Sequence, residues 1–395
     1  MIVFYNPHVD DFFSAPPHYK LLKRRALKKY GYIFDGILKE NKKINVYIDY
    51  SSSAYLHDRY FGRLPKVIRK AITSIEIKKW LKINDFKDKI NFIDITEAKD
   101  LVLFAMSYKG ARGPFSLRVD NLNRFKQVIF HLSHYFVATK EKANHIKQLA
   151  DVWLCGDSDI GKNAYFQHYF SWYSKKILII PFSIQPRFVR QKDFAKRNNY
   201  AITTGSFHNL YEEKPKSNYE DYLRFFDCSS YHPVRKLLYE KKDQLSGIID
   251  VKISGYREVS KSSKLKKIFK LFFASQKKYF SFDIVSLYND YKFAVIGEES
   301  VGFPAIGAFE AMACGCVLIA QKGYYEGLGL VEGEHFIAYD GTVENLCVVI
   351  RQLQKMEKEK LSDISLAGEY YCESLKPVLS YQRFIEQLKS LNEVV

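Results

Sequence analysis

Short apolar segments alternate with helical patterns along nearly the whole 395-residue chain, and this alternation is the feature that most constrains the fold. Such an order is typical of βαβ units, in which helices join parallel strands and cover both faces of the sheet. The alternation runs in two series, separated by a proline-containing stretch at residues 181–199. The sequence therefore predicts an α/β protein with two Rossmann-like domains, each built on a doubly wound parallel sheet.

The expected elements share simple signals: strands are short and apolar, and helices show a spacing of three to four residues. In the first series we expect strands at 2–5, 44–48, 100–104, 127–130, 150–155 and 176–181, and helices at 20–41, 139–149 and 162–173. In the second series we expect strands at 200–205, 251–255, 291–296 and 317–320, and helices at 232–244, 343–358 and 381–391.

One segment near the C-terminus, residues 302–320, reads Gly-Phe-Pro-Ala-Ile-Gly-Ala-Phe-Glu-Ala-Met-Ala-Cys-Gly-Cys-Val-Leu-Ile-Ala. It predicts a helix that carries Glu310 near its start, ends at Gly315 as a C′ residue, and leads into a buried parallel strand. The amides and dipole at the start of such a helix favour an anionic nucleotide at the strand ends. A carboxylate there is better suited to accept hydrogen bonds from ribose or sugar hydroxyls than to meet phosphate.

This segment resembles the Glu-Ala-Met-Ala-Cys-Gly motif of GT-B nucleotide-sugar glycosyltransferases, especially the large retaining family with paired glutamates (glycosyl transferases group 1). Two other stretches, ADVWLCGDSDIGKN…KKILIIPFSI and AITTGSF, resemble the end of a GT-B N-terminal domain and the first strand of its nucleotide-binding domain. The resemblance implies two domains facing a central cleft. We expect an acceptor-binding domain at 1–188, a nucleotide-sugar-binding domain at 189–376, and a C-terminal helix at 377–395 that crosses back.

The second glutamate of the retaining family lies eight positions before Glu310, where this chain has Gly302. Glu298 and Glu299, just upstream, are candidates to occupy the same space as catalytic acids. The segment 291–300 also resembles inverting fucosyltransferases, so retention and inversion both remain open.

The resemblance further implies that basic side chains, rather than a metal, neutralise the departing diphosphate. The family places Arg and Lys after the first strand of its second domain, whereas this chain has His208 and Lys214 after Gly205. Arg235 and Arg257 are the other basic candidates. The donor-side residues are therefore Gly205, Lys214, Arg235, Arg257, Glu310 and the helix-start residues Phe303, Pro304 and Ala305.

In the N-terminal domain, His131 and His134 follow the expected strand at 127–130. Similar enzymes place a His at such a strand end, against the donor sugar, and His134 is also a catalytic candidate. Asp11, next to Asp10 after the first strand, is a candidate general base for the acceptor hydroxyl, which an inverting reaction requires.

Asp157-Ser158-Asp159 matches the Asp-x-Asp motif of metal-dependent transferases. Its position between a strand and a helix favours another interpretation, in which Ser158 or Asp159 caps the helix. The six cysteines are scattered without metal-ligand spacing, and we expect reduced thiols and no metal site.

The net charge of +17 indicates an anionic partner. The stretch 261–278 carries apolar residues at helical spacing with lysines on the other side. It could be a packed surface helix with a solvated face, or it could dock on an anionic membrane. No nucleic-acid motif accompanies the charge, so we expect no nucleic-acid partner.

No apolar run is long enough to span a membrane, and no signal peptide is visible. We expect a cytoplasmic protein, which would be peripheral on the cytoplasmic face of the inner membrane if the stretch 261–278 docks there. The resemblance to GT-B enzymes implies a hexosyltransferase-like, metal-independent glycosyltransferase without a resident cofactor. Its donor would be a UDP- or GDP-sugar, and its acceptor a hydroxyl of a surface glycan such as lipopolysaccharide or capsule. A GT-B nucleotide-sugar epimerase and a non-enzymatic basic binding protein for membranes or nucleic acid remain alternatives.

Overall fold

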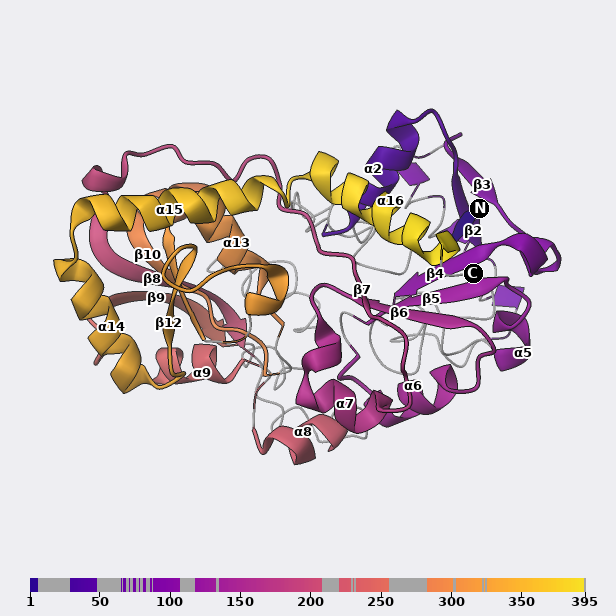
Figure 1. Ribbon diagram of the computed structural model, residues 1–395, viewed down its shortest axis with the longest axis horizontal. Helices are drawn as coiled ribbons and strands as arrows, with labels where there is room; N and C mark the ends of the chain where they lie inside the picture. Colours follow the sequence, from indigo (N-terminus) through magenta and orange to yellow (C-terminus); the bar gives the residue numbers. More distant parts are fainter. Residues whose placement is uncertain are drawn as a thin grey trace. The chain divides into compact units, whose positions relative to one another are not determined.

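The chain forms two compact units in the computed structural model (Figure 1). The first unit comprises Met1–Ser183, Ser217–Tyr222 and Ser380–Val395, and the second comprises Ile184–Lys216 and Leu223–Leu379. The structure describes residues 1–5, 29–47, 65, 67–68, 71, 74–75, 78, 81–82, 86, 88–106, 118–132, 135–207, 220–228, 230, 232–255, 283–300, 303–321, 323 and 325–393.

A seven-stranded parallel sheet forms the centre of the first unit, in the order β3-β2-β1-β4-β5-β6-β7. Every residue of β5 and β6 is buried, as expected for parallel strands that are covered on both faces. The strands are β1 (Ile2–Tyr5), β2 (Ile44–Tyr47), β3 (Ile90–Phe92), β4 (Val102–Met106), β5 (Gln127–His131), β6 (Val152–Gly156) and β7 (Leu178–Ile179).

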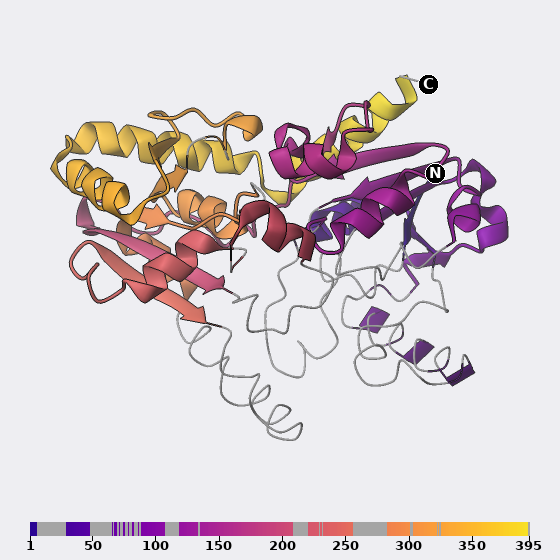
Figure 2. The same cartoon turned by 90° about the horizontal axis from the view of Figure 1, so that it is seen from below.

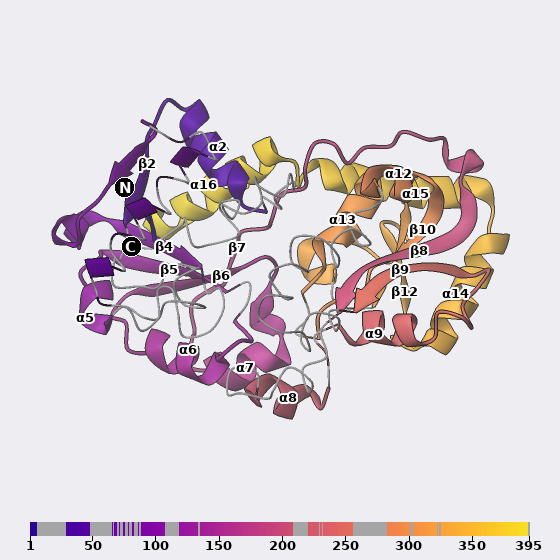
Figure 3. The same ribbon diagram turned by 180° about the vertical axis from the view of Figure 1, so that it is seen from behind.

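Helices cover both faces of this sheet (Figures 1 and 3). From β1 the chain adds strands in one direction and from β4 in the other, so right-handed connections place their helices on opposite faces. The helix α2 (Gly31–Lys39) packs on β1, and α16 (Pro377–Glu393) on β4, through the ring pairs Phe4–Phe34 and Phe104–Phe384. The other face carries α5 (Val119–Leu122), α6 (Thr139–Ile146) and α7 (Ala164–Phe170).

The C-terminal helix α16 completes the first unit, so that both chain termini belong to it (Figure 2). A Cβ atom at Gly36 of α2 would overlap the ring of Tyr381, which shows how closely these two helices pack. On the other face, Tyr222 of α8 (Glu220–Phe226) packs against Phe136 and Tyr165.

The second unit has a five-stranded parallel sheet in the order β12-β11-β10-β8-β9. Alternate side chains of β10 and β11, such as Phe293 and Val317, join one hydrophobic core with Leu238 and Ile350 of the helices on that face. The strands are β8 (Asn198–Phe207), β9 (Ile249–Gly255), β10 (Tyr291–Val295), β11 (Val317–Gln321) and β12 (Phe336–Tyr339).

Figures 1 and 3 show α9 (Pro233–Glu240) and α14 (Val343–Lys355) on one side of this sheet. The helices α12 (Ile284–Asn289), α13 (Ile306–Ala313) and α15 (Lys358–Glu373) lie on the other side. Pro233 occupies the first turn of α9, and Thr342 caps α14 by accepting a hydrogen bond from the Asn345 amide at 3.2 Å.

The C-terminus of α13 confirms the predicted role of Gly315. This glycine has φ +82°, its N–H donates to the carbonyl of Met312, and the Cys316 N–H donates to that of Ala311. These two bonds make a Schellman cap, which turns the chain directly into β11.

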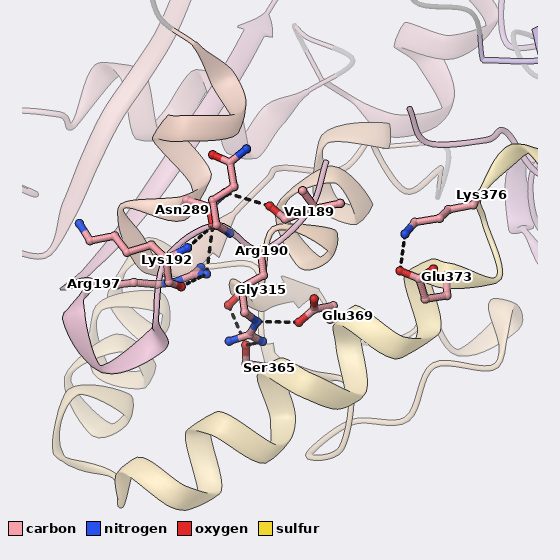
Figure 4. A network of polar contacts seen from close by, with 11 residues as sticks. Val189, Arg190, Lys192, Arg197, Asn289, Gly315, Ser365, Glu369, Glu373 and Lys376 are labelled. Carbon is pink, nitrogen blue, oxygen red and sulfur yellow. Dashed lines mark hydrogen bonds and ion pairs between the residues drawn. The ribbon is translucent and has the colours of Figure 1, made fainter. Parts of the chain in front are cut away.

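A polar network ties residues 189–197 to the second unit (Figure 4). Arg190 donates to Glu369 at 2.7 Å and to the hydroxyl of Ser365 at 2.9 Å, and Ser365 in turn donates to the Gly315 carbonyl. Beside it, Asn289 accepts from Arg197 at 3.2 Å and donates to the Val189 carbonyl at 3.1 Å. The segment that enters the second unit is thus bonded to α12, α15 and the turn after α13.

The described strands confirm the predicted two-unit parallel α/β architecture. Among the described strands and α-helices, β3, β12, α5, α8, α12 and α15 were not expected from the sequence. None of the described helices combines the length and apolarity that a membrane crossing requires.

Candidate active site

Arg235 lies at the carboxyl edge of the second sheet, in the first turn of α9. Its Nε donates to the carbonyl of Gly297 at 2.9 Å, and its Nη1 donates to the carbonyl of Ser206 at 3.2 Å. These carbonyls belong to the end of β8 and to the loop after β10. The residue is only 9% exposed, so a fixed, buried cation bridges two neighbouring strand ends.

Two glycines leave room for this guanidinium. Gly205 has φ +130°, and a Cβ there would lie 3.1 Å from three atoms of Arg235. A Cβ at Gly297 would lie 2.9 Å from Cγ of Arg235. Both strand ends therefore lack side chains where the arginine crosses them, and the predicted donor-side residues Gly205 and Arg235 are in direct contact.

Glu298 lies three residues after the end of β10 and is 2% exposed. Its Oε1 accepts a hydrogen bond from the Gln321 amide at 3.3 Å, which links the loop after β10 to the end of β11. The Tyr325 hydroxyl lies near the same carboxyl but makes no well-aligned hydrogen bond to it. Burial raises the pKa of Glu298 to about 7, and the backbone amides of Glu298 and Gln321, with smaller effects of Tyr325 and Arg235, only partly offset that rise.

Glu299 differs from its neighbour because its side chain is 19% exposed. Its Oε1 lies 3.7 Å from Nε2 of His232, the residue that precedes α9. Its amide donates to the carbonyl of Phe303 at 3.3 Å, which closes the loop between β10 and α13. Of the two predicted acids, Glu299 is the more exposed, while Glu298 is enclosed.

Sequence reasoning did not select His232, although it lies only three residues before Arg235. Its side chain is 13% exposed, and its amide donates to the hydroxyl of Ser230 at 3.2 Å. The signal that could have found it is the His-Pro pair, because Pro233 marks a helix start that faces the strand ends.

Glu310 lies in the second turn of α13 and is 7% exposed, so its side chain is not turned into solvent. The helix begins after Ala305, which has no side-chain acceptor for the first amides. Phe303 and Pro304 are buried in the approach to the helix. This geometry matches the predicted helix with an acid near its start and uncapped amides at its N-terminus.

In the first unit, His131 is the last residue of β5 and is fully buried. Its Nε2 lies 3.0 Å from the carbonyl oxygen of Ile180, which can only accept, so Nε2 carries the proton. Burial lowers the pKa of His131, so the ring is neutral and Nδ1 is a bare acceptor. Within the described part of the chain, this nitrogen has no hydrogen-bond partner.

Around His131 lies a compact polar cluster. The Tyr30 ring packs 4.8 Å from the imidazole, and its hydroxyl donates to Asp157. Oδ1 of Asp157 is 3.6 Å from Nε2 of His131. The first acid of the Asp-Ser-Asp segment thus contacts the residues that surround the histidine. The predicted cap is wrong: Asn163 caps α7, and Asp159 makes no side-chain cap bond to the short 3-10 helix Ile160–Lys162.

Several predicted residues lie outside the described part of the chain: Asp10, Asp11, His134, His208, Lys214, Arg257, Gly302 and the basic stretch 261–278. Among the residues that are described, no three His, Cys, Asp or Glu side chains form a group able to hold a metal ion.

The whole architecture has solved counterparts. A glycosyltransferase from Rickettsia africae ESF-5 matches with a TM-score of 0.51 and 12% identity, over 98% of this chain and 97% of that one. The sucrose-phosphate synthase from Thermosynechococcus elongatus matches with a TM-score of 0.51 and 9% identity, over 100% and 99%. The chain has the GT-B fold. No family model and no curated protein sequence matches it.

In this GT-B fold the second sheet brings Gly205, Arg235, Glu298 and Glu299 to one edge, and His131 lies at the corresponding edge of the first sheet. A buried cation between strand ends suits an anionic ligand, and a bare imidazole nitrogen suits a hydroxyl.

Proposed function

We propose that the protein is a metal-independent glycosyltransferase, which moves a sugar from a UDP- or GDP-sugar to a hydroxyl of a surface glycan. The observation that carries this proposal is Arg235, fixed as a buried cation across the ends of β8 and β10. The two solved counterparts, a glycosyltransferase and a sucrose-phosphate synthase, support it through their shared fold.

The proposed reaction breaks the bond between the anomeric carbon of the donor and its diphosphate oxygen. That oxygen keeps the electron pair, and the acceptor oxygen forms the new bond to carbon. The acceptor proton goes to a base, which would be Asp11 if the reaction inverts and the departing diphosphate oxygen if it retains. Arg235 would stabilise the charge that grows on the diphosphate, because a fixed cation in a buried site needs no reorganisation during the reaction. The amides at the start of α13 would add to the same field.

Two acids have separate roles in this proposal. Glu310 would accept hydrogen bonds from the ribose hydroxyls of the donor. Glu299 would face the donor sugar, since it is the more exposed member of its pair and lies beside His232. In the first unit, Nδ1 of His131 would accept a hydrogen bond from a sugar hydroxyl.

The test is a panel of UDP- and GDP-sugars, measured first by thermal shift and then by product analysis with and without glycan acceptors. A donor that binds the native state raises its melting temperature by mass action. We expect Glu310→Gln to keep the fold and lose most of the turnover, with Glu359→Gln, an exposed acid of α15, as the matched control.

Each result bears on a different alternative. A changed sugar with donor alone would indicate an epimerase. No shift with any nucleotide sugar would reject the proposed function. The anomeric configuration of the product, read by NMR, would decide between retention and inversion.

We also propose that the acceptor is lipid-linked, which the basic amphipathic pattern at 261–278 supports. Replacement of Phe269 and Phe272 by alanine should weaken binding to phosphatidylglycerol vesicles while leaving donor binding intact. Equal vesicle binding by the variant and the parent would reject membrane docking without touching the transferase proposal.

A further inference from the structure

Three strand ends of the second sheet are joined by two ionisable side chains. Arg235 bridges the end of β8 and the loop after β10 through the Ser206 and Gly297 carbonyls. Glu298 links that same loop to the end of β11 through the Gln321 amide. Glu298 and Arg235 therefore both bond to the segments around the loop after β10, at the edge of the sheet where the proposed donor binds.

We propose that Glu298 is a positioning residue of the donor site. In its neutral form Glu298 holds these strand ends together, and loss of its proton weakens binding of the anionic donor. This inference rests on the proposed function.

The surroundings of Glu298 explain why its neutral form is favoured. It is 2% exposed, and burial is the largest cause of a pKa raised to about 7. The backbone amides of Glu298 itself and of Gln321, then the Tyr325 hydroxyl after β11 and the charge of Arg235 on α9, lower that pKa. Burial, then Glu298 and Tyr339 at the end of β12, hold the pKa of Tyr325 well above its usual range. Tyr325 therefore stays neutral between pH 6 and pH 8, whereas Glu298 changes charge near pH 7.

Ionisation of Glu298 would place a negative charge beside Arg235. That charge weakens the attraction of the guanidinium for a diphosphate, whatever other partners the arginine has. Conversely, a bound diphosphate disfavours the carboxylate and raises its pKa. Donor binding near pH 7 should therefore take up protons, and the affinity should fall as the pH rises.

The experiment measures UDP-glucose and GDP-mannose binding by calorimetry at pH 6, 7 and 8. These donors carry no phosphate monoester, so their own charge is constant over this range. For the parent protein we expect donor affinity to fall between pH 6 and pH 8. The fall should be up to about tenfold for each unit by which the bound diphosphate raises the pKa of Glu298. Glu298→Gln should bind with the pH 6 affinity of the parent at all three values, because the amide mimics the protonated acid.

Two further measurements test whether Glu298 causes the pH dependence of donor binding. Glu359→Gln, the exposed control, should keep the pH dependence of the parent. Calorimetry of the parent in buffers of different ionisation enthalpy should show proton uptake at pH 7, which needs no variant to fold.

The two proposals fail in different ways. A parent protein that binds a donor equally at pH 6 and 8, or a Glu298→Gln variant that keeps the full pH dependence, would overturn the role of Glu298 and leave the transferase intact. No binding of any nucleotide sugar by parent or variant would reject the transferase, and this inference with it.

Discussion

Arg235 donates a hydrogen bond from Nε to the carbonyl oxygen of Gly297, 2.9 Å away, and so joins α9 to the loop after β10. Parallel strands leave carbonyl groups without partners where they end, and a buried carbonyl must find a donor. A guanidinium offers several donors in one plane, so it can serve two strand ends at once. It is also a permanent cation, and the same group that completes the sheet edge can attract a diphosphate.

Replacement of Gly205 by alanine should disturb both roles of Arg235. The backbone there has φ +130°, which costs any L-residue free energy, and the new Cβ would lie 3.1 Å from the guanidinium. We expect the free energy of unfolding to fall by about 1–3 kcal/mol and donor affinity to fall at least severalfold. Thermal unfolding and calorimetry measure the two effects.

Gly247→Ala is the matched control, because Gly247 also has positive φ but a Cβ added there would meet nothing within 4 Å. It should lose stability and keep donor affinity. Equal donor affinity in both variants would show that the position of Arg235 is unimportant for binding.

The raised pKa of Glu298 also predicts how stability depends on pH. The folded protein keeps this carboxyl protonated up to about pH 7, whereas its ordinary value is 4.5, so between these values the native state binds more protons than the unfolded chain. The stabilising contribution is fully present below pH 4.5 and is lost as the pH rises to 7. The parent should lose up to about 3 kcal/mol relative to Glu298→Gln over this window.

Urea unfolding at several values from pH 4.5 to 8 measures this difference. The difference in free energy of unfolding between parent and variant should widen up to about pH 7 and then stay constant. A gap that is the same at every pH would mean that Glu298 titrates normally in the folded protein.

The sequence predicted the elements whose signals are local. The strands β5, β6, β10 and β11 consist mainly of apolar residues, and Gly315 marks the end of α13. The helix α15 was not predicted because its buried face has only two large apolar residues, Leu361 and Ile364, and continues with Ser365, Gly368 and Cys372. A Cβ at Gly368 would come within 3.1 Å of Met312, so this part of the face packs on α13 by close approach.

The site was predictable in part for the same reason. Glu310 and Gly205 lie in recognisable segments, but the difference between Glu298 and Glu299 depends on burial and on partners distant in sequence. Gln321 and Tyr325 lie next to Glu298, whereas His232 lies beside Glu299. Adjacent glutamates in a loop carry no sequence signal that separates these two environments.

The network around Arg190 predicts a second stability difference (Figure 4). Arg190→Ala would remove the hydrogen-bond donors to the partly buried Glu369 and the fully buried Ser365. It should lower the free energy of unfolding by about 1–3 kcal/mol. Lys376→Ala breaks a more exposed ion pair with Glu373 and should cost less than about 1 kcal/mol. Urea unfolding compares them, and equal costs would mean that the buried bonds of Arg190 add nothing.

The last prediction separates the two nitrogens of His131. In His131→Gln the amide nitrogen can take the place of Nε2 and still donate to the Ile180 carbonyl, but the acceptor at Nδ1 is gone. We expect this variant to keep its stability and to lose about 10²-fold or more in kcat, the range typical of a single positioned polar group. In His131→Asn the amide oxygen can replace the Nδ1 acceptor, while the bond to Ile180 is lost. That variant should be less stable and keep more of the activity. Transfer assays with matched thermal unfolding give both readouts, and full activity in His131→Gln would show that Nδ1 does not meet the substrate.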